Sequence, residues 1–273
     1  MYFANRLLTF LPVVALVQTV AVALEPSQIY QIAEGISVLI DGQNPGSGVT
    51  VAEENGTYYV LTAKHVVETE DEYTLITPDK KQYVLDYSRI VKFEGVDLAL
   101  VVFESDRKLE TAQLADSQET SPGTEVHIYG FPNPGREITN RIPQFTSGKI
   151  TATSTLKDGY GLVYDNITRA GMSGGPVLNS NGQVVGIHGR AEAEETDAVS
   201  KIGLNLGIPI ATFIEMASDL GIDAIANSSE SDTSIPPTPP PIPAPANGVP
   251  SRPTVITSPQ SDPNSPVCAG RNC

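Results

Sequence analysis

The sequence has 273 residues, of which 32 are acidic and 17 are Lys or Arg, so its formal net charge is −15. A chain this acidic is a poor partner for nucleic acid or anionic lipid, both of which attract basic surfaces. Its two cysteines, Cys268 and Cys273, lie at the extreme C-terminal end, which excludes a small scaffold held together by disulfides. A structural zinc site needs about four ligands, and we expect neither a metal nor an organic cofactor.

The first 23 residues have the features of a secretory signal peptide. Arg6 provides a positive charge, residues 7–22 are mostly apolar, and Ala21 and Ala23 place small side chains at the positions that precede a cut. The apolar stretch is shorter than the ~20 residues of a membrane-spanning helix, and Pro12 interrupts it, so an uncleaved anchor is the weaker alternative. We expect cleavage after Ala23 and a mature chain that is secreted or periplasmic and not inserted in a membrane.

Residues 24–227 are predicted to form one all-β domain. Short runs rich in β-branched and aromatic residues alternate with turn signals, and Asn181-Gly182 between two apolar runs predicts a tight hairpin. We interpret the region as two antiparallel Greek-key β-barrels, about residues 30–110 and 121–208, joined by the polar stretch 104–123. The predicted strands are Tyr58–Thr62, Tyr83–Leu85, Leu98–Phe103, Val126–Tyr129, Leu162–Tyr164 and Val184–His188.

A C-terminal helix is expected at about residues 209–220, followed by a tail. Pro209 suits the first position of a helix, Ile210 and Phe213 fall on one face with later apolar residues, and Gly221 would end it. From residue 228 the composition changes to Ser, Thr, Asn and Pro, which predicts a disordered Pro-rich tail over residues 228–273. A solvated spacer is the preferred interpretation of this tail, and contact with a partner through it is the alternative.

Ser173 is the first candidate for chemistry, because it stands in the run Gly-Met-Ser-Gly-Gly-Pro at residues 171–176. A serine hydroxyl needs a neighbouring base before it can attack a carbonyl group. Glycines around it allow a sharp turn whose main-chain N–H groups converge on a developing oxyanion. Taken alone, the run is equally well explained as a glycine-rich turn.

His65 and Asp97 are candidates for the base and for the group that orients it. His65 follows the strand-like run 58–63, so its imidazole is expected at the end of a strand. Asp97 opens the apolar run 98–103, and a carboxylate at the mouth of a buried strand is costly unless it is paired. Either residue could instead be structural, and Asp86 and Asp106 compete with Asp97 for the role.

Together, the segments around His65 (Thr-Ala-Lys-His-Val-Val), Asp97 (Val-Asp-Leu-Ala-Leu) and Ser173 resemble the three signature segments of the chymotrypsin-like serine peptidases of the bacterial type. Residues 46–49 and 206–210 are similar to that branch as well. The resemblance implies a serine endopeptidase in which Ser173 attacks the peptide bond, His65 transfers the proton and Asp97 orients the imidazole. It also implies an oxyanion hole formed by the N–H groups of Gly171 and Ser173, and polypeptides as substrates.

The specificity of such a peptidase is suggested by residues near the nucleophile. Ile167 stands where relatives that cut after Arg or Lys carry an Asp, so tryptic specificity is not expected. Thr168 and His188 match positions that hold the substrate carboxylate in glutamyl endopeptidases, and Arg190 could add positive potential, which predicts a preference for Glu or Asp at P1. The alternative is a wide site that accepts small apolar residues.

Two other functions remain open at this stage. A catalytically silent or zymogen-like binding module would keep the fold without the activity. An esterase of the α/β-hydrolase type is suggested formally by the Gly-x-Ser-x-Gly pattern at residues 171–175. In that class a helix follows the serine directly, whereas the residues after Ser173 predict a β-hairpin, and the order His, Asp, Ser also differs.

Overall fold

The computed structural model describes residues 23–115, 120–194 and 200–218. The chain divides into two compact units, Met1–Asp232 and Thr233–Cys273, and all described residues belong to the first. The expected signal peptide, apart from its last residue, lies outside the described residues, as does the Pro-rich tail with Cys268 and Cys273. Among the helices in the described ranges, none is long and apolar enough to cross a membrane.

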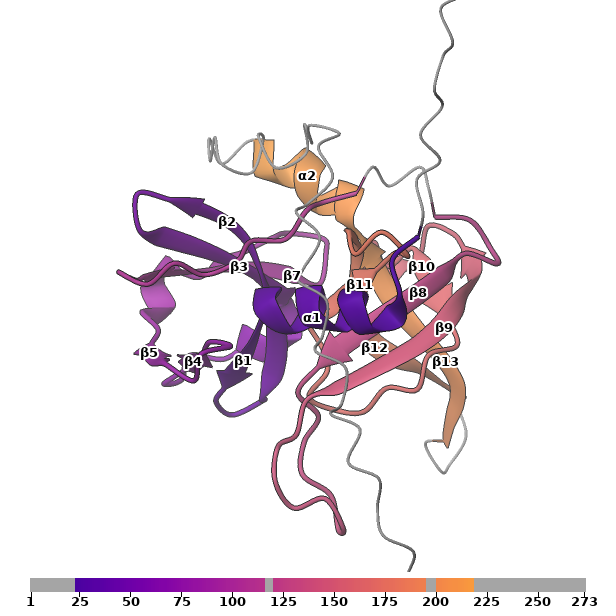
Figure 1. The fold of residues 1–273 in the computed structure, drawn as a ribbon, viewed down its shortest axis with the longest axis horizontal. Helices are drawn as coiled ribbons and strands as arrows, with labels where there is room; N and C mark the ends of the chain where they lie inside the picture. The colour runs from indigo at the N-terminus through magenta and orange to yellow at the C-terminus, as the bar shows by residue number, and fades with distance from the viewer. Residues whose placement is uncertain (1–22, 116–119, 195–199, 219–273) are drawn as a thin grey trace, which may run out of the picture. The chain divides into compact units, whose positions relative to one another are not determined.

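The N-terminal half is an antiparallel sheet of seven strands in the order β5-β4-β1-β2-β3-β7-β6 (Figure 1). The predicted strands beginning near Tyr58, Tyr83 and Leu98 are confirmed as β3, β5 and β7. In the pairings of the described residues this sheet is an open half-barrel, whereas a closed barrel was expected. Its strands are β1 (Ser37–Asp41), β2 (Gly46–Glu54), β3 (Thr57–Ala63), β4 (Thr74–Ile76), β5 (Gln82–Val84), β6 (Val91–Lys92) and β7 (Leu98–Glu104).

The C-terminal half is a closed antiparallel barrel in the order β10-β13-β12-β11-β8-β9 (Figure 1). The predicted strands beginning near Val126, Leu162 and Val184 are confirmed as β8, β10 and β12. The barrel consists of β8 (Glu125–Gly130), β9 (Gln144–Thr153), β10 (Leu162–Tyr164), β11 (Pro176–Leu178), β12 (Val184–Glu194) and β13 (Ser200–Pro209). The predicted all-β class with two antiparallel halves is therefore correct.

The hairpin between β11 and β12 decides between the two folds that the sequence suggested. Gly182 has φ of 74°, as a tight turn requires, and the Asn179 side chain accepts hydrogen bonds from the N–H groups of Asn181 and Gln183. Ser173 is thus followed by strand, turn and strand. The α/β-hydrolase alternative, which needs a helix at this point, is excluded.

In the described part of the chain, two α-helices flank the sheets, and the sequence predicted one of them. The C-terminal helix α2 (Ile210–Ala217) begins one residue later than expected, because Pro209 keeps an extended backbone and acts as the N-cap residue. Its Phe213 is fully buried and meets Phe93 edge-to-face at 6.0 Å. The predicted end of this helix, at Leu220, lies outside the described residues.

Helix α1 (Pro26–Ile36) was not predicted, although its signals are present. Pro26 occupies an early position, and the Gln28 side chain accepts a 3.0 Å hydrogen bond from the Glu25 N–H at the helix start. Ile29, Ala33 and Ile36 are buried at helical spacing. The helix packs against β2, β8 and β11, so it covers the boundary between the two halves (Figure 1).

One of the buried hydrophobic clusters spans the two halves. Leu61 and Leu98 from the N-terminal sheet lie in the same buried cluster as Leu178, Ile187 and Ile208 from the barrel. Three short 3-10 turns complete the described elements: η1 (Lys64–Val67), η2 (Tyr87–Arg89) and η4 (Lys157–Gly159). Two of them, η1 and η4, lie at the boundary between the halves and position the residues described next.

Candidate active site

His65 lies in η1, directly after the last residue of β3. Val66 and Val67 are buried, and the Lys64 N–H donates a 3.0 Å hydrogen bond to the Asp97 carbonyl, which fixes the turn to the start of β7. The His65 side chain itself stays 39 % exposed. The imidazole is thereby held at a strand end, as the sequence predicted, with part of the ring exposed to solvent.

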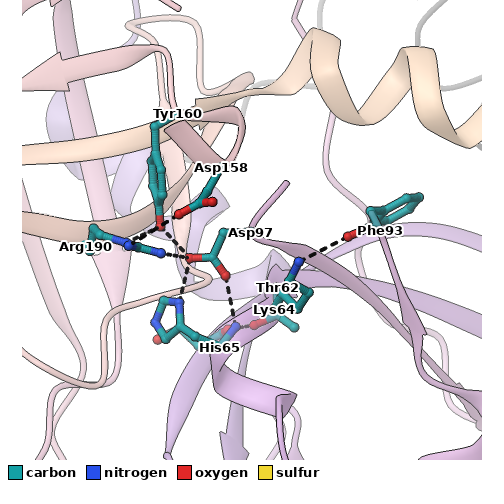
Figure 2. A network of polar contacts seen from close by, with 9 residues as sticks. Thr62, Lys64, His65, Phe93, Asp97, Asp158, Tyr160 and Arg190 are labelled. Atoms are coloured by element: carbon teal, nitrogen blue, oxygen red, sulfur yellow. Dashed lines mark hydrogen bonds and ion pairs between the residues drawn. The ribbon is translucent and has the colours of Figure 1, made fainter. Parts of the chain in front are cut away.

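Asp97 lies beside His65 and is almost completely buried, with 4 % of its side chain exposed. His65 Nδ1 is 2.8 Å from Asp97 Oδ2, and the His65 N–H donates a 3.0 Å bond to Oδ1 (Figure 2). The two rival carboxylates lie elsewhere: Asp86 caps η2 by accepting from Ser88, and Asp106 is exposed. Of the three candidates, only Asp97 can orient this imidazole.

Two further donors reach Asp97 from the C-terminal barrel (Figure 2). The Tyr160 hydroxyl donates a 2.6 Å hydrogen bond to Oδ2, and Arg190 Nη2 lies 2.8 Å from the same oxygen. Arg190 Nε donates to the Tyr160 oxygen at 3.0 Å, and its Nη1 is 3.7 Å from Asp158 Oδ2. Asp97 therefore belongs to a polar cluster that spans the two halves of the domain.

The environment of this cluster fixes its protonation states. Burial alone would raise the pKa of the Asp97 carboxyl, but the hydrogen bonds and charges of its partners outweigh burial and hold that pKa well below its usual range. Burial, reinforced by the bond to Asp97, raises the pKa of Tyr160. Asp97 is consequently ionised and Tyr160 is a neutral donor near neutral pH.

Ser173 lies in a loop whose shape depends on its glycines. Gly171 and Gly174 have φ of 95° and 88°, values that side chains other than glycine rarely adopt. A Cβ atom on Gly174 would lie 2.0 Å from the Ser47 carbonyl oxygen and 2.2 Å from Thr62 Oγ1. The loop is thus packed directly against the end of β3, the strand that leads to His65.

The N–H groups of Gly171 and Ser173 donate to no carbonyl or side chain within the described part of the chain. The neighbouring N–H groups of Met172 and Gly174 do donate, to Arg169 and to His188. The two N–H groups expected in an oxyanion hole therefore differ from their neighbours. The Ser173 hydroxyl is not hydrogen-bonded to His65 in the described residues, and such bonds commonly tighten only when substrate binds.

Ser47, on β2, joins the nucleophile loop to the N-terminal sheet. Its N–H donates a 2.7 Å bond to the Ser173 carbonyl, and its hydroxyl donates 2.9 Å to the Gly171 carbonyl. The same hydroxyl accepts a 2.9 Å bond from the Phe131 N–H, and Ser47 is fully buried. This role of Ser47 was not predicted from the sequence, in which residues 46–49 are only one of the segments that resemble the bacterial type.

The three residues proposed for specificity are separated into two environments. Thr168 donates to the Asn205 side chain on β13, and His188, which is 2 % exposed, shares a 2.7 Å hydrogen bond through Nδ1 with the Tyr164 hydroxyl. His188 is paired with Gly207 on β13, two residues from Asn205, so Thr168 and His188 border the same strand. Arg190 is not grouped with them, because its guanidinium is engaged by Asp97.

Tyr160 is the site residue that the sequence analysis missed altogether. The Asp-Gly pair at residues 158–159 indicates a turn, but no local pattern shows that the next hydroxyl contacts a carboxylate 63 positions away. Within the described ranges, no three His, Cys, Asp or Glu side chains are grouped so as to hold a metal ion.

Comparison with known proteins places the chain in a family. The family model described as "Trypsin-like peptidase domain" matches residues 46–187, which is more than half of the chain. The chain is 27 % identical over 184 residues to a Do-like HtrA serine protease of Lactobacillus helveticus, covering 66 % of this chain and 44 % of the relative. It is 30 % identical over 176 residues to a probable periplasmic do/HhoA-like serine protease of Haemophilus influenzae, covering 64 % and 35 %.

Two further similarities extend the comparison. Exfoliative toxin A of Staphylococcus aureus is 25 % identical over 195 residues, covering 63 % of this chain and 65 % of the toxin. A solved structure of an HtrA-type protease with a decapeptide matches with a TM-score of 0.58 at 18 % identity, covering 73 % of this chain and 68 % of the other, which supports the fold. The chain spans less than half of the HtrA relatives given above. With its two antiparallel β halves and the matched segment 46–187, the chain belongs to the trypsin-like, chymotrypsin-fold serine peptidase family.

Proposed function

We propose that the protein is an exported serine endopeptidase that uses Ser173 as nucleophile, His65 as general base and acid, and Asp97 as the residue that orients His65. The observation that carries the proposal is the 2.8 Å contact between His65 Nδ1 and the buried Asp97 carboxylate at the strand end against which the Ser173 loop is packed. This arrangement leaves the other imidazole nitrogen for the proton of a nucleophile.

The proposed reaction has two halves. In the first, Ser173 Oγ forms a bond to the scissile carbonyl carbon while His65 Nε2 takes the hydroxyl proton, and the N–H groups of Gly171 and Ser173 donate to the oxyanion. The C–N bond then breaks, and His65 returns the proton to the departing amine. In the second half, water attacks the acyl-enzyme ester with His65 again as base, which releases the acid and restores Ser173.

Asp97 has two roles in this scheme. As acceptor for Nδ1–H, it selects the imidazole tautomer whose Nε2 is a base. As an ionised carboxylate, it stabilises the imidazolium that forms during each proton transfer. The pKa of Asp97, held well below its usual range, keeps the carboxylate charged wherever His65 can act as a base.

The test compares the wild-type chain with Ser173→Ala on a mixture of unstructured peptides, with cut sites identified by mass spectrometry. We expect cuts by the wild type that fall by several orders of magnitude in the variant, because the nucleophile is lost while the fold is kept. A fluorophosphonate should label the wild type at Ser173 and leave the variant unlabelled. Undiminished cleavage by Ser173→Ala would refute the proposal, and a folded wild type without cuts or label would favour the binding-module function.

We further propose that the S1 subsite prefers Glu or Asp. The support is that Thr168 and His188 border the same part of β13, where a hydroxyl and an imidazole together suit a carboxylate. Thr168→Val should then lower kcat/KM for a peptide with Glu at P1 more than for its Ala counterpart. Cuts concentrated after small apolar residues in the wild type would discard this preference and leave the endopeptidase proposal intact.

Export and domain organisation complete the proposal. We propose a signal peptide over residues 1–23, a peptidase domain over residues 24–227 and a spacer tail over residues 228–273. The name of the Haemophilus influenzae relative as periplasmic supports export. N-terminal sequencing of the protein recovered outside the cytoplasm should begin at Leu24, and an N-terminus at Met1 in that fraction would contradict the cleavage.

A further inference from the structure

We propose that Arg190 and Tyr160 are positioning residues that hold Asp97 in place across the two halves of the domain and set the charge felt by His65. This inference rests on the proposed function, since it assigns a role in the same site. Neither residue touches the reacting atoms, and both would act through Asp97.

The Asp97 carboxylate is held in one orientation by its hydrogen bonds. Its Oδ1 accepts the His65 N–H, and its Oδ2 accepts from His65 Nδ1, Tyr160 and Arg190 (Figure 2). The Asp97 backbone is also fixed, because its N–H donates 2.8 Å to the Asp158 carbonyl and its carbonyl accepts from Lys64. A carboxylate bound on both oxygens and both sides of its backbone has one orientation.

Tyr160 reaches Asp97 through an uncommon turn and a gap left by a glycine. The turn η4 brings two consecutive left-handed residues, Asp158 with φ of 57° and Gly159 with φ of 79°, against the start of β7. Gly189, on β12, leaves room for the tyrosine ring, since a Cβ there would lie 2.2 Å from the Tyr160 hydroxyl. An uncommon backbone conformation and a missing side chain together allow this one contact.

The Arg190 side chain is directed at the same cluster. The pairing of β12 with β13 shifts register between His188 and Arg190, and such bulges redirect side chains. All three guanidinium nitrogens face the cluster: Nη2 faces Asp97, Nε faces Tyr160 and Nη1 faces Asp158. The guanidinium also lies 4.8 Å from the centre of the Tyr160 ring. Because all three nitrogens already have partners in the cluster, we infer that the guanidinium binds Asp97 and not a substrate carboxylate.

The contacts on Asp97 join residues from the two halves of the domain. His65 and Asp97 belong to the N-terminal sheet, whereas Tyr160 and Arg190 belong to the barrel that carries Ser173. The contacts on Asp97 therefore fix the base relative to the nucleophile. A loss of about 1 Å in such alignment can cost about a hundredfold in rate.

Arg190 also affects the charge balance of the site. The charged groups that the described elements bring to this cluster are Asp97, Arg190, Asp158 and Lys64, in addition to His65. Without Arg190, the carboxylate of Asp97 would act on the imidazolium with no cation bound to it, which favours the protonated form of His65. The acid limb of the kcat/KM profile should then move to higher pH.

The experiment measures kcat, KM and the pH profile of the full chain on one peptide that the wild type cuts, with active sites counted by fluorophosphonate titration. Tyr160→Phe and Arg190→Ala should each lower kcat per active site by about ten- to a hundredfold with KM nearly unchanged. Arg190→Ala should also move the acid limb to higher pH. Arg190→Lys should keep the limb near the wild-type position while kcat stays reduced, because it retains the charge without the paired bonds.

Two matched variants serve as controls. Arg89→Ala removes an exposed arginine bound to Glu104 at 3.1 Å, and Tyr83→Phe removes a tyrosine hydroxyl bound to Ser105 at 2.7 Å. Both should leave kcat and the pH profile unchanged. The low-field NMR signal of the His65 Nδ1 proton, a readout that needs no activity, should shift in Arg190→Ala and stay in place in Arg89→Ala.

The outcomes separate this inference from the proposed function. Wild-type kcat and an unmoved acid limb in both Tyr160→Phe and Arg190→Ala would overturn the positioning role while leaving the peptidase intact. A second result would also overturn it: total activity that falls only in proportion to the number of titratable active sites, with the acid limb of the kcat/KM profile unmoved. That result is expected if the two residues have a purely structural role. A wild type with no Ser173-dependent activity refutes the peptidase, and the NMR comparison still tests the contact of Arg190 with the His–Asp pair.

Discussion

The hydroxyl of Ser47 donates a 2.9 Å hydrogen bond to the carbonyl of Gly171, across 124 positions of the chain. The bond holds the peptide that precedes Met172 from the side of the N-terminal sheet, and the same hydroxyl accepts from the Phe131 N–H. The Gly171 carbonyl and the Gly171 N–H belong to adjacent peptide groups, so a bond that fixes the first constrains the second. A buried hydroxyl of one half thus shapes the proposed oxyanion hole of the other.

Ser47→Ala should therefore lower kcat by about tenfold with little change in KM, because the proposed oxyanion donors lose their anchor. It should also cost about 1–3 kcal/mol of unfolding free energy, since the Phe131 N–H loses its acceptor. Steady-state kinetics and denaturant titration measure the two effects. Ser88→Ala, which removes an exposed hydroxyl bound to Asp86, is the control and should change neither.

Gly174→Ala should abolish activity and strongly reduce the yield of folded protein. The added Cβ would lie 2.0 Å from the Ser47 carbonyl oxygen and 3.1 Å from the Ala63 nitrogen, and these backbone atoms cannot swing away as the end of a flexible side chain can. Gly123→Ala is the matched control, because Gly123 has a similar φ of 95° with nothing within 4 Å of the added atom. It should cost only the left-handed strain, about 1 kcal/mol. Equal stability losses in the two variants would contradict this account.

Gly189→Ala should lower kcat by about tenfold by displacing the Tyr160 hydroxyl from Asp97. The backbone of Gly189 is not left-handed, so the substitution adds no backbone strain, and its effect comes from the contact of the new Cβ with Tyr160. Circular dichroism should show an unchanged fold, and kinetics should show a loss in kcat larger than any rise in KM. A variant with wild-type kcat would mean that the tyrosine can yield without consequence.

Stability should fall on acidification in a way that depends on Asp97. Its pKa in the folded protein lies below the unfolded value of about 3.9, so the carboxylate stabilises the fold above that pH. As pH falls from about 4 toward the folded pKa, the unfolded chain binds the proton first and the contribution is lost. Denaturant titrations over this range should show a shallower decline for Asp97→Asn than for the wild type.

Helix α1 should contribute to the stability of the whole domain. Ile29 is 1 % exposed within the shared core, so Ile29→Ala should cost about 2–5 kcal/mol of unfolding free energy. Ile138→Ala, at a side chain 42 % exposed, should change it by less than about 0.5 kcal/mol. Thermal or denaturant unfolding of both variants measures the difference, and equal effects would mean that α1 is dispensable.

The sequence was sufficient to predict what local patterns encode. Leu98–Phe103 and Val126–Tyr129 are apolar runs with strand-forming residues, and both are strands in the structure. The hairpin at Asn181-Gly182 follows from the tolerance of these residues for positive φ. The pairing of His65 with Asp97 was implied by the resemblance of their segments to a known family, and in the structure His65 Nδ1 is 2.8 Å from Asp97 Oδ2.

The missing parts depend on contacts that no local pattern records. Tyr160 and Arg190 contact Asp97 across 63 and 93 positions, whereas Arg190 was expected to add positive potential near Thr168 and His188. The N-terminal half was expected to be a barrel, but it is a sheet whose edge strands β5 and β6 do not pair in the described residues. This difference could not be predicted, because strand patterns say nothing about whether the two edges of a sheet meet. Helix α1 was not predicted, although its buried residues Ile29, Ala33 and Ile36 recur at helical spacing.

The segment between β7 and β8 bridges the two halves in a way that bears on how the site comes into being. Ala112 donates to Thr50 on β2, whereas Ala115 and Val184, at the start of β12, are joined by a hydrogen bond from the Ala115 N–H. A chain cut in this segment would yield one fragment with the base and another with the nucleophile. Catalysis by such a pair would be second order in fragment concentration, because the two fragments would have to bind each other before the site could form. The covalent link removes this dependence on concentration.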